Sequence, residues 1–326
     1  MYKIIEDFIQ KYNITPCSTD DSTSTHFISG DTSIDQTQGF LYVLLNYINN
    51  FGDIDSLNID KSIFKNTIFE DFKISEKDLK QNWNNIEITS SPSRKVGDLF
   101  WSTGVDWDKY ENLNILDICC GAGGYAKKIF NWSNKKVRSY SGFDINQNNK
   151  WSSVIEWGKE NSVNVSFDKV NLDECDILKI IPDKTNFFMS QSAIEHIKYD
   201  LRYFHAVKKY CDSVDFPVTQ VHVFPGPASL KLYLYHGYRQ YGISSIAKIA
   251  KIFPNEKIKL VRMCGDACND LHYERITKPV SVDHSKDIRK VNPILYDQLL
   301  LNAIFLDMKQ EIKIPCFWGM IIESNK

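Results

Sequence analysis

From residue 113 onward, short apolar runs alternate with amphipathic segments in which apolar positions recur every three or four residues. The first pattern predicts buried strands and the second predicts helices. We expect strands at 114–120, 137–145, 163–170, 185–192, 218–225, 257–265 and 315–324, and helices at 125–133, 150–161 and 195–211. Strands that alternate with helices are typical of a parallel sheet with helices on both faces.

The N-terminal third of the chain has a different pattern. It predicts an amphipathic helix at 1–15, a loop rich in Ser, Thr and Asp at 16–38, a helix at 39–51 and a mixed segment at 52–95. We therefore divide the chain into a mostly helical N-terminal cap or accessory region, residues 1–95, and an α/β domain, residues 96–326. Residues 91–101 are expected to cover the binding pocket from the side of the cap.

Composition narrows the possible partners. The chain of 326 residues has 39 Lys and Arg against 41 Asp and Glu, a net charge of −2. Nucleic-acid binders usually carry a basic surface, so we expect no nucleic-acid partner. The apolar runs are too short to cross a bilayer, which predicts no membrane span. The N-terminus lacks the features of a secretory signal, and eight scattered cysteines suit a reducing, cytoplasmic location.

A glycine turn follows the first expected strand of the α/β domain. Gly121 and Gly123 lie between this strand and its helix, where glycine lets the backbone approach a ligand and presents free N–H groups. Asp117 precedes the turn, and its charge suits a cationic ligand better than the pyrophosphate of a dinucleotide. Asp144 ends the next strand, about twenty residues after Gly123, the spacing at which an acidic residue binds ribose hydroxyls.

Three runs together resemble class I S-adenosylmethionine-dependent methyltransferases. They are DICCGAGG at 117–124, FDIN at 143–146 and FFMSQSAIEHI at 187–197. The resemblance covers roughly residues 96–326. It implies a Rossmann-like, seven-stranded, mostly parallel sheet with helices on both faces, whose last two strands form a reversed hairpin. It also implies S-adenosyl-L-methionine as the cofactor.

The resemblance further implies a set of cofactor-binding residues. Cys119 stands where the family usually has its first glycine, and Asn171 where it often has an aspartate that binds the adenine amino group. The amide oxygen of Asn171 can accept the same hydrogen bond. The implied residues are Asp117, Cys119, Gly121, Gly123, Asp144, Ile145, Asn171, Leu172 and Gln191.

The acceptor side is expected after the fourth and fifth strands of the α/β domain. His236 is our first candidate for a general base and His196 the second, although a histidine at the latter position is often structural. Tyr238, Arg239 and Tyr241 suit contacts with a sugar or another polar ring. The run 233–242 also fits an amphipathic helix packed on the sheet.

No metal ligands are predicted. The spacing of Cys264, Cys268 and His272 is interpreted as incidental, because structural zinc usually has four ligands at tighter spacing.

These features predict a methyltransferase that modifies a hydroxyl of a sugar, glycan or other small polar metabolite. Two alternatives stay open at this point. One is a nicotinamide-dependent oxidoreductase, since the same glycine turn serves dinucleotides. The other is a non-catalytic binding module that keeps the methyltransferase fold. The sequence does not indicate an oligomeric state.

Overall fold

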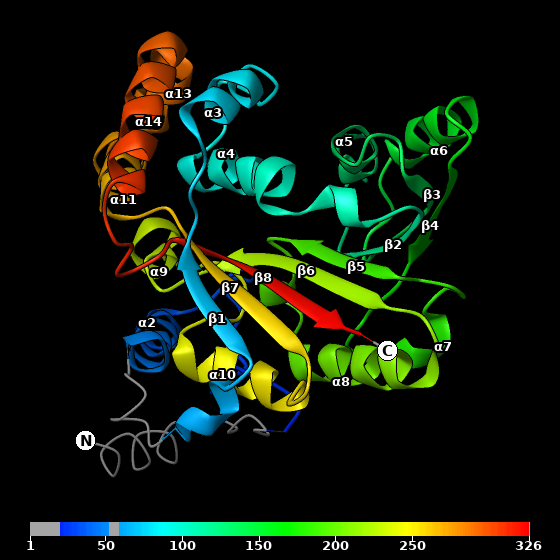
Figure 1. The fold of residues 1–326 in the computed structure, drawn as a ribbon. Helices are drawn as coiled ribbons and strands as arrows, with labels where there is room; N and C mark the ends of the chain where they lie inside the picture. The colour runs from blue at the N-terminus through cyan, green and yellow to red at the C-terminus, as the bar shows by residue number, and fades with distance from the viewer. Residues whose placement is uncertain (1–19, 52–58, 326) are drawn as a thin grey trace.

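A computed structural model describes residues 20–51 and 59–325, and these residues form an eight-stranded sheet. The helix expected at 1–15 lies outside the described residues. The strands lie in the order β1-β7-β8-β6-β5-β2-β3-β4 (Figure 1). Their bounds are β1 (Thr67–Asp71), β2 (Leu113–Ile118), β3 (Val137–Asp144), β4 (Asn164–Lys169), β5 (Phe187–Gln191), β6 (Val218–Pro225), β7 (Lys257–Met263) and β8 (Phe317–Ser324).

Helices cover both faces of this sheet. In Figure 1, α8 and α10 lie below the sheet, and α4, α5 and α6 lie above it. The bounds are α2 (Gln36–Phe51), α3 (Glu76–Trp83), α4 (Pro92–Leu99), α5 (Tyr125–Trp132), α6 (Trp151–Glu160), α7 (Ile177–Ile180), α8 (Asp200–Ser213), α9 (Ser229–Tyr233), α10 (Ile243–Ile252), α11 (Asp266–His272), α12 (Lys278–Val282), α13 (Ile288–Val291) and α14 (Pro293–Met308). The predicted α/β class is confirmed.

One strand runs against all the others. β8 lies between β6 and β7 and is antiparallel to both, whereas every other neighbouring pair is parallel. This arrangement confirms the expected reversed C-terminal strand. The sheet also has one strand more than expected, because β1 from the N-terminal region pairs in parallel with β7, Thr67 opposite Ile258. The segment was not predicted as a strand because its five residues, TIFED, form neither an apolar run nor an alternating pattern.

The central strand β2 shows why continuous apolar runs in the sequence indicated strands. Leu113 and Ile115 contribute to a hydrophobic cluster on one face of the sheet, and Leu116 and Ile118 contribute to a second cluster on the other face. A strand buried on both faces is apolar at successive positions and does not alternate. The pattern therefore predicted the centre of the sheet better than its edges.

Local capping sets several helix starts. The Ser75 side chain accepts a hydrogen bond from the backbone of Asp78 at the start of α3, and Ser91 does the same for Arg94 at the start of α4. α4 also has Pro92 in its first turn, where a missing N–H costs nothing. This helix runs across residue 95, the boundary that we placed between the two regions; the division itself stays a prediction.

Two expected elements differ in extent. The predicted helix at 195–211 begins only at Asp200, because Ile194–His196 form a short 3-10 helix and a turn follows it. The connection between β7 and β8 contains α11, α12, α13 and α14, which the sequence pattern did not predict.

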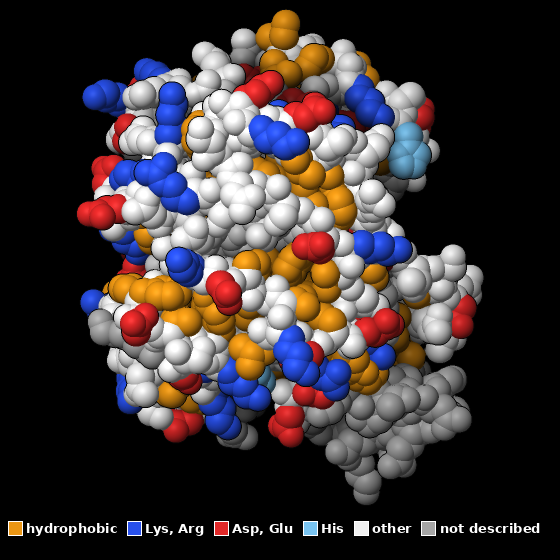
Figure 2. Space-filling view, turned by 90° about the vertical axis from the view of Figure 1, so that its right-hand side faces the viewer, with side chains coloured by type: hydrophobic (Ala, Val, Ile, Leu, Met, Phe, Trp, Pro, Cys, Tyr) orange, Lys and Arg blue, Asp and Glu red, His pale blue; other side chains and the backbone are white. Residues whose placement is uncertain are grey.

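The surface is mixed in charge on the face shown in Figure 2. Lys and Arg side chains are interspersed there with Asp and Glu. Across the described ranges, none of the helices combines the length and apolar character needed to span a membrane.

Candidate functional site

The strand ends that carry the predicted cofactor residues border one pocket of about 450 Å³, within the size range of small-molecule sites. Parallel neighbours β2, β3 and β4 bring their carboxyl ends to one edge of the sheet, and β5 lies beside β2. Cys119, Asp144, Ile145, Asn171 and Leu172 all line the pocket, and Ser192, Ala193, His196 and Tyr238 complete it together with Ser29 and Asp31.

The Asp144 carboxylate lies at the end of β3, and loop backbone holds it in place. Its Oδ2 accepts a hydrogen bond of 2.9 Å from the N–H of Gly121, and its Oδ1 accepts one of 3.0 Å from the N–H of Asn146. The carboxylate is partly exposed and lines the pocket. It is therefore oriented in advance for a ligand with hydroxyl groups.

The two predicted glycines of the turn have different roles. Both have left-handed backbones, with φ of +55° at Gly121 and +71° at Gly123. A Cβ at Gly121 would meet open space, whereas a Cβ at Gly123 would lie 2.4 Å from the ring of Phe167. Neither glycine lines the pocket. Gly123 is thus required by packing against Phe167, and Gly121 leaves the backbone open to approach.

Cys119 adopts the conformation that glycine prefers. Its φ is +52°, a left-handed value that costs a side-chain-bearing residue free energy. Burial, followed by the negative charge of Asp144, raises the pKa of its thiol, so the group stays protonated. Cys119 borders the pocket as a small neutral side chain.

Asp117 lies behind the pocket and does not line it. Its side chain is buried, and Tyr140 donates a short hydrogen bond to it. Burial raises the pKa of Asp117 to about 7, against the lowering effect of the Tyr140 hydrogen bond. In this structure Asp117 therefore positions the end of β2.

Gln191, at the end of β5, contacts Trp101, which follows α4. Its side-chain oxygen accepts a 2.6 Å hydrogen bond from the indole N–H of Trp101, which is fully buried. Its Nε2 is buried and has no hydrogen-bond partner among the described residues. Gln191 does not line the pocket.

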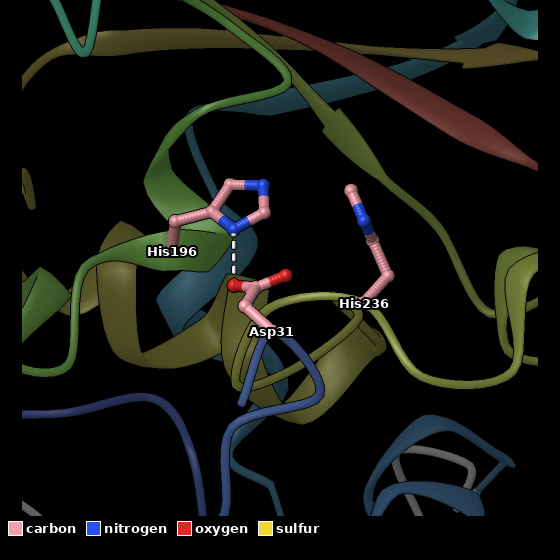
Figure 3. Close-up of side chains that lie close together, drawn as sticks. All are labelled: Asp31, His196 and His236. Carbon is pink, nitrogen blue, oxygen red and sulfur yellow. Dashed lines mark hydrogen bonds and ion pairs between the residues drawn. The ribbon is translucent and has the colours of Figure 1, made fainter. Parts of the chain in front are cut away.

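A cluster of titratable side chains borders the opposite side of the pocket (Figure 3). His196 Nδ1 donates a 2.6 Å hydrogen bond to Asp31 Oδ2, and the rings of His196 and His236 meet edge to face at 4.7 Å. The buried carboxylate of Glu195 places its Oε1 3.4 Å from His236 Nε2 and 3.8 Å from His196 Nε2. The two predicted catalytic histidines are thus brought together beside two carboxylates.

These contacts set the protonation of the cluster. Burial alone would lower the pKa of His196, but the hydrogen bond to Asp31 and the charge of Glu195 outweigh burial and raise it. The hydrogen bond from His196 in turn lowers the pKa of Asp31 to about 2, in spite of partial burial.

Two predicted substrate residues are buried in the core, which does not fit substrate contact. The Arg239 side chain is fully buried, donates to the carbonyls of Ile197 and Lys198, and forms an ion pair of 3.3 Å with Asp200. Tyr241 is also fully buried and donates to Asp200 at 2.8 Å. Both side chains hold the end of the sheet together. Tyr238, in contrast, does line the pocket.

Sequence reasoning missed the contribution of the N-terminal loop. Ser29 and Asp31 line the pocket, although they belong to a segment that we expected to be only a loop. Short polar residues without periodicity carry no signal of long-range contact.

Comparisons with known proteins give the following matches. No family model matches the chain, and no curated protein matches it. Among solved structures, phosphoethanolamine N-methyltransferase 2 of Haemonchus contortus, in complex with S-adenosyl-L-methionine, is 16% identical with a TM-score of 0.42; the match covers 84% of this chain and 58% of that one. A SAM-dependent methyltransferase from Aquifex aeolicus is 14% identical with a TM-score of 0.36, over 57% of this chain and 90% of that one.

The strand order of the sheet identifies the fold. Seven strands in the order β4-β3-β2-β5-β6-β8-β7, with β8 reversed, form the sheet that the resemblance implied. The chain has a class I methyltransferase fold.

Proposed function

We propose that the protein is an S-adenosylmethionine-dependent methyltransferase that acts on a hydroxyl of a small polar acceptor, such as a sugar. The observation that carries this proposal is the pocket at the ends of β2, β3 and β4. It collects Cys119, Asp144, Ile145, Asn171 and Leu172, five of the residues expected to bind the cofactor.

The chemistry of these side chains fits that part of the cofactor. The oriented carboxylate of Asp144 can accept hydrogen bonds from ribose hydroxyls. Asn171 offers an amide to the edge of the adenine ring, and Ile145 and Leu172 offer apolar surface to its faces. Ile145 is 52% exposed, so its apolar surface is open to a ligand in the pocket.

The acceptor would bind on the side of the histidine cluster. When bound, S-adenosylmethionine supplies a methyl group on a positively charged sulfur. The chain must orient an acceptor hydroxyl and remove its proton. His196 and Tyr238 line the pocket on this side, and His236 lies directly beside His196. His236 is the candidate general base, since about a third of its side chain is exposed.

Calorimetric titration with S-adenosylhomocysteine tests the proposal. We expect micromolar binding by the wild type, weakened about tenfold to a hundredfold in Asp144→Ala, because charge-assisted hydrogen bonds to the ribose would be lost. Asp168→Ala is the matched control, since Asp168 is an exposed residue of β4 outside the pocket.

Two outcomes would contradict the proposal. The first is no binding of S-adenosylhomocysteine by the folded wild-type protein. The second is tight binding of NADH in a fluorescence titration, which would favour the oxidoreductase alternative instead.

A further inference from the structure

We propose that Glu195, His196 and His236 bind a divalent first-row transition-metal ion at the acceptor side of the pocket, with Asp31 as the residue that positions His196. Cation binding stands on the geometry of the cluster alone. The role of the cation in methyl transfer rests on the function proposed above.

Asp31, His196 and His236 each offer one ligand atom, and these atoms lie within 4.8 Å of one another. Two separations from the neighbouring Glu195 approach those around a shared ion. Two atoms that each lie about 2.1 Å from one metal ion are about 3.0 Å apart in octahedral and about 3.4 Å apart in tetrahedral geometry. Glu195 Oε1 lies 3.4 Å from His236 Nε2 and 3.8 Å from His196 Nε2. The separation from His236 matches the tetrahedral value, whereas the one from His196 is longer and would have to shorten when an ion binds.

Glu195 provides a second, independent observation. Its side chain is fully buried, and its Oε1 accepts a hydrogen bond of 3.0 Å from Ser192. Its Oε2 is buried without a hydrogen-bond partner among the described residues. A buried carboxylate with an unsatisfied oxygen is costly unless a cation or donor compensates it. A cation between Oε1 and the two histidines would compensate the charge of this buried carboxylate, although the oxygen without a partner is Oε2.

Asp31 supplies the support that metal-binding histidines usually have. A ligating imidazole commonly donates its other N–H to a carboxylate, which fixes the ring and its tautomer. His196 does this through Nδ1, at 2.6 Å from Asp31 Oδ2, which leaves Nε2 free to bind a cation. Asp31 is itself fixed by the N–H of Gly237, 3.1 Å from its Oδ1. Figure 3 shows Asp31 below the two rings.

The backbone holds the three loops of the cluster in one arrangement. The N–H of Gly30 donates to the carbonyl of Gly237 at 2.7 Å, and the N–H of Tyr238 donates to the carbonyl of Glu195 at 2.8 Å. Tyr42 adds a hydrogen bond of 2.8 Å to the carbonyl of His236. A cluster held by several backbone contacts is organised before any ion binds.

The donor set indicates the class of cation. Two imidazole nitrogens with carboxylate oxygen suit Mn²⁺, Fe²⁺ or Zn²⁺, whereas Mg²⁺ and Ca²⁺ prefer oxygen ligands alone. An ion at this place would orient an acceptor hydroxyl and lower its pKa, so that the hydroxyl loses its proton to solvent more readily. The cation would then take the place of His236 as the means of deprotonation.

The test uses the untagged full chain after treatment with a chelator. Titration with Mn²⁺ is followed by electron paramagnetic resonance, in which free Mn²⁺ is measured directly. We expect one saturable site, which a large excess of Mg²⁺ does not displace. His236→Gln and Glu195→Gln should abolish this site, and Asp31→Asn should weaken it 10- to 100-fold, the usual effect of losing a carboxylate behind a metal-bound histidine.

His205→Gln is the matched control, because His205 is an exposed histidine of α8 outside the cluster. It should bind Mn²⁺ like the wild type. If Glu195→Gln does not fold, Mn²⁺ binding by His236→Gln decides between the outcomes, because the His236 side chain is partly exposed.

Either of two results overturns the metal proposal: the absence of a saturable Mn²⁺ site in the wild type, or unchanged binding in His236→Gln. Titration of each variant with S-adenosylhomocysteine separates this proposal from the proposed function. Loss of Mn²⁺ binding with retained S-adenosylhomocysteine binding supports both. Mn²⁺ binding without S-adenosylhomocysteine binding supports the metal site and contradicts the methyltransferase function.

Discussion

Two residues beside the pocket have backbones that ordinary side chains rarely adopt. Cys119, after β2, has a φ of +52°, and Ser192, after β5, has a φ of +53°. Left-handed non-glycine residues cost free energy and are often found at functional sites. The resemblance placed Cys119 at a position where the family usually has glycine, and this conformation explains that preference.

Replacement of Cys119 should therefore depend on the backbone preference of the new residue. Cys119→Gly removes the left-handed strain but adds freedom to the unfolded chain, so its stability should stay within about 1 kcal/mol of wild type. Cys119→Val should lose about 1–2 kcal/mol or more, because a β-branched residue fits this region poorly. Thermal unfolding of the three proteins measures the difference. Equal stability of the Gly and Val variants would show that the conformation carries no strain.

His222 predicts an acid-sensitive fold. It is fully buried on β6, its Nδ1 lies 2.8 Å from Ser190 Oγ, and burial lowers its pKa to about 3. The unfolded chain binds a proton at this site below pH 6.5, whereas the folded chain does not until about pH 3. The stability that neutral His222 contributes is thus present above pH 6.5 and is lost as the pH falls toward 3.

When the pH falls from 6.5 to 5, this one group should lower the free energy of unfolding by about 2 kcal/mol. Urea unfolding at both pH values measures the loss, and His222→Gln should show a smaller loss than the wild type. An equal loss in both proteins would assign the acid sensitivity to other groups, such as the buried His26, whose pKa burial lowers to about 4.

At the level of single residues, the sequence predicted that several side chains at strand ends would lie close together, and they do. Asp144, Ile145, Asn171 and Leu172 line one pocket because topology alone brings those strand ends together. Sequence reasoning failed in the run after β6, since the direction of a loop side chain is not encoded in a periodic pattern. Arg239 and Tyr241 point into the core.

At the scale of elements, the site depends on three loops that meet closely. Gly30 shows how closely: a Cβ at this position would lie 2.4 Å from the backbone nitrogen of His236. No side chain fits between these two loops. The docking of residues 29–31 onto residues 235–237 therefore requires glycine at position 30.

Gly30→Ala should separate these loops. We expect the free energy of unfolding to fall by about 1–3 kcal/mol, the usual range for overpacking. We also expect faster hydrogen exchange at the N–H of Gly237, which in the wild type donates to Asp31. Hydrogen exchange with mass spectrometry measures the second effect. Gly124→Ala is the control, because a Cβ at Gly124 meets nothing within 4 Å. Unchanged exchange in Gly30→Ala would contradict the tight docking.

The elements themselves were predicted unevenly. Most strands and helices from β2 to β6 were predicted, because the central strands are apolar runs and the longer helices have an apolar face. β1 was missed because its residues TIFED form neither an apolar run nor an alternating pattern, and α14 was missed because its apolar residues do not follow a single face.

At the scale of the whole molecule, the N-terminal region is part of the sheet and part of the pocket. β1 extends the sheet beyond β7. In the other half of the sheet, Ser29 and Asp31 line the pocket at the ends of β2 to β5. A truncated chain that begins at residue 96 would therefore lose an edge strand and Asp31 together, so the full chain is the right material for the binding experiments.

The pairing of β1 with β7 also has a consequence for biosynthesis. Thr67 pairs with Ile258, so the ribosome makes β1 long before the strand that binds it. Likewise, residues 29–31 bind to residues 235–237, which are synthesised much later. Both segments thus lack these pairing partners until late in translation. We infer that these segments dock last during co-translational folding and need protection from premature association until then.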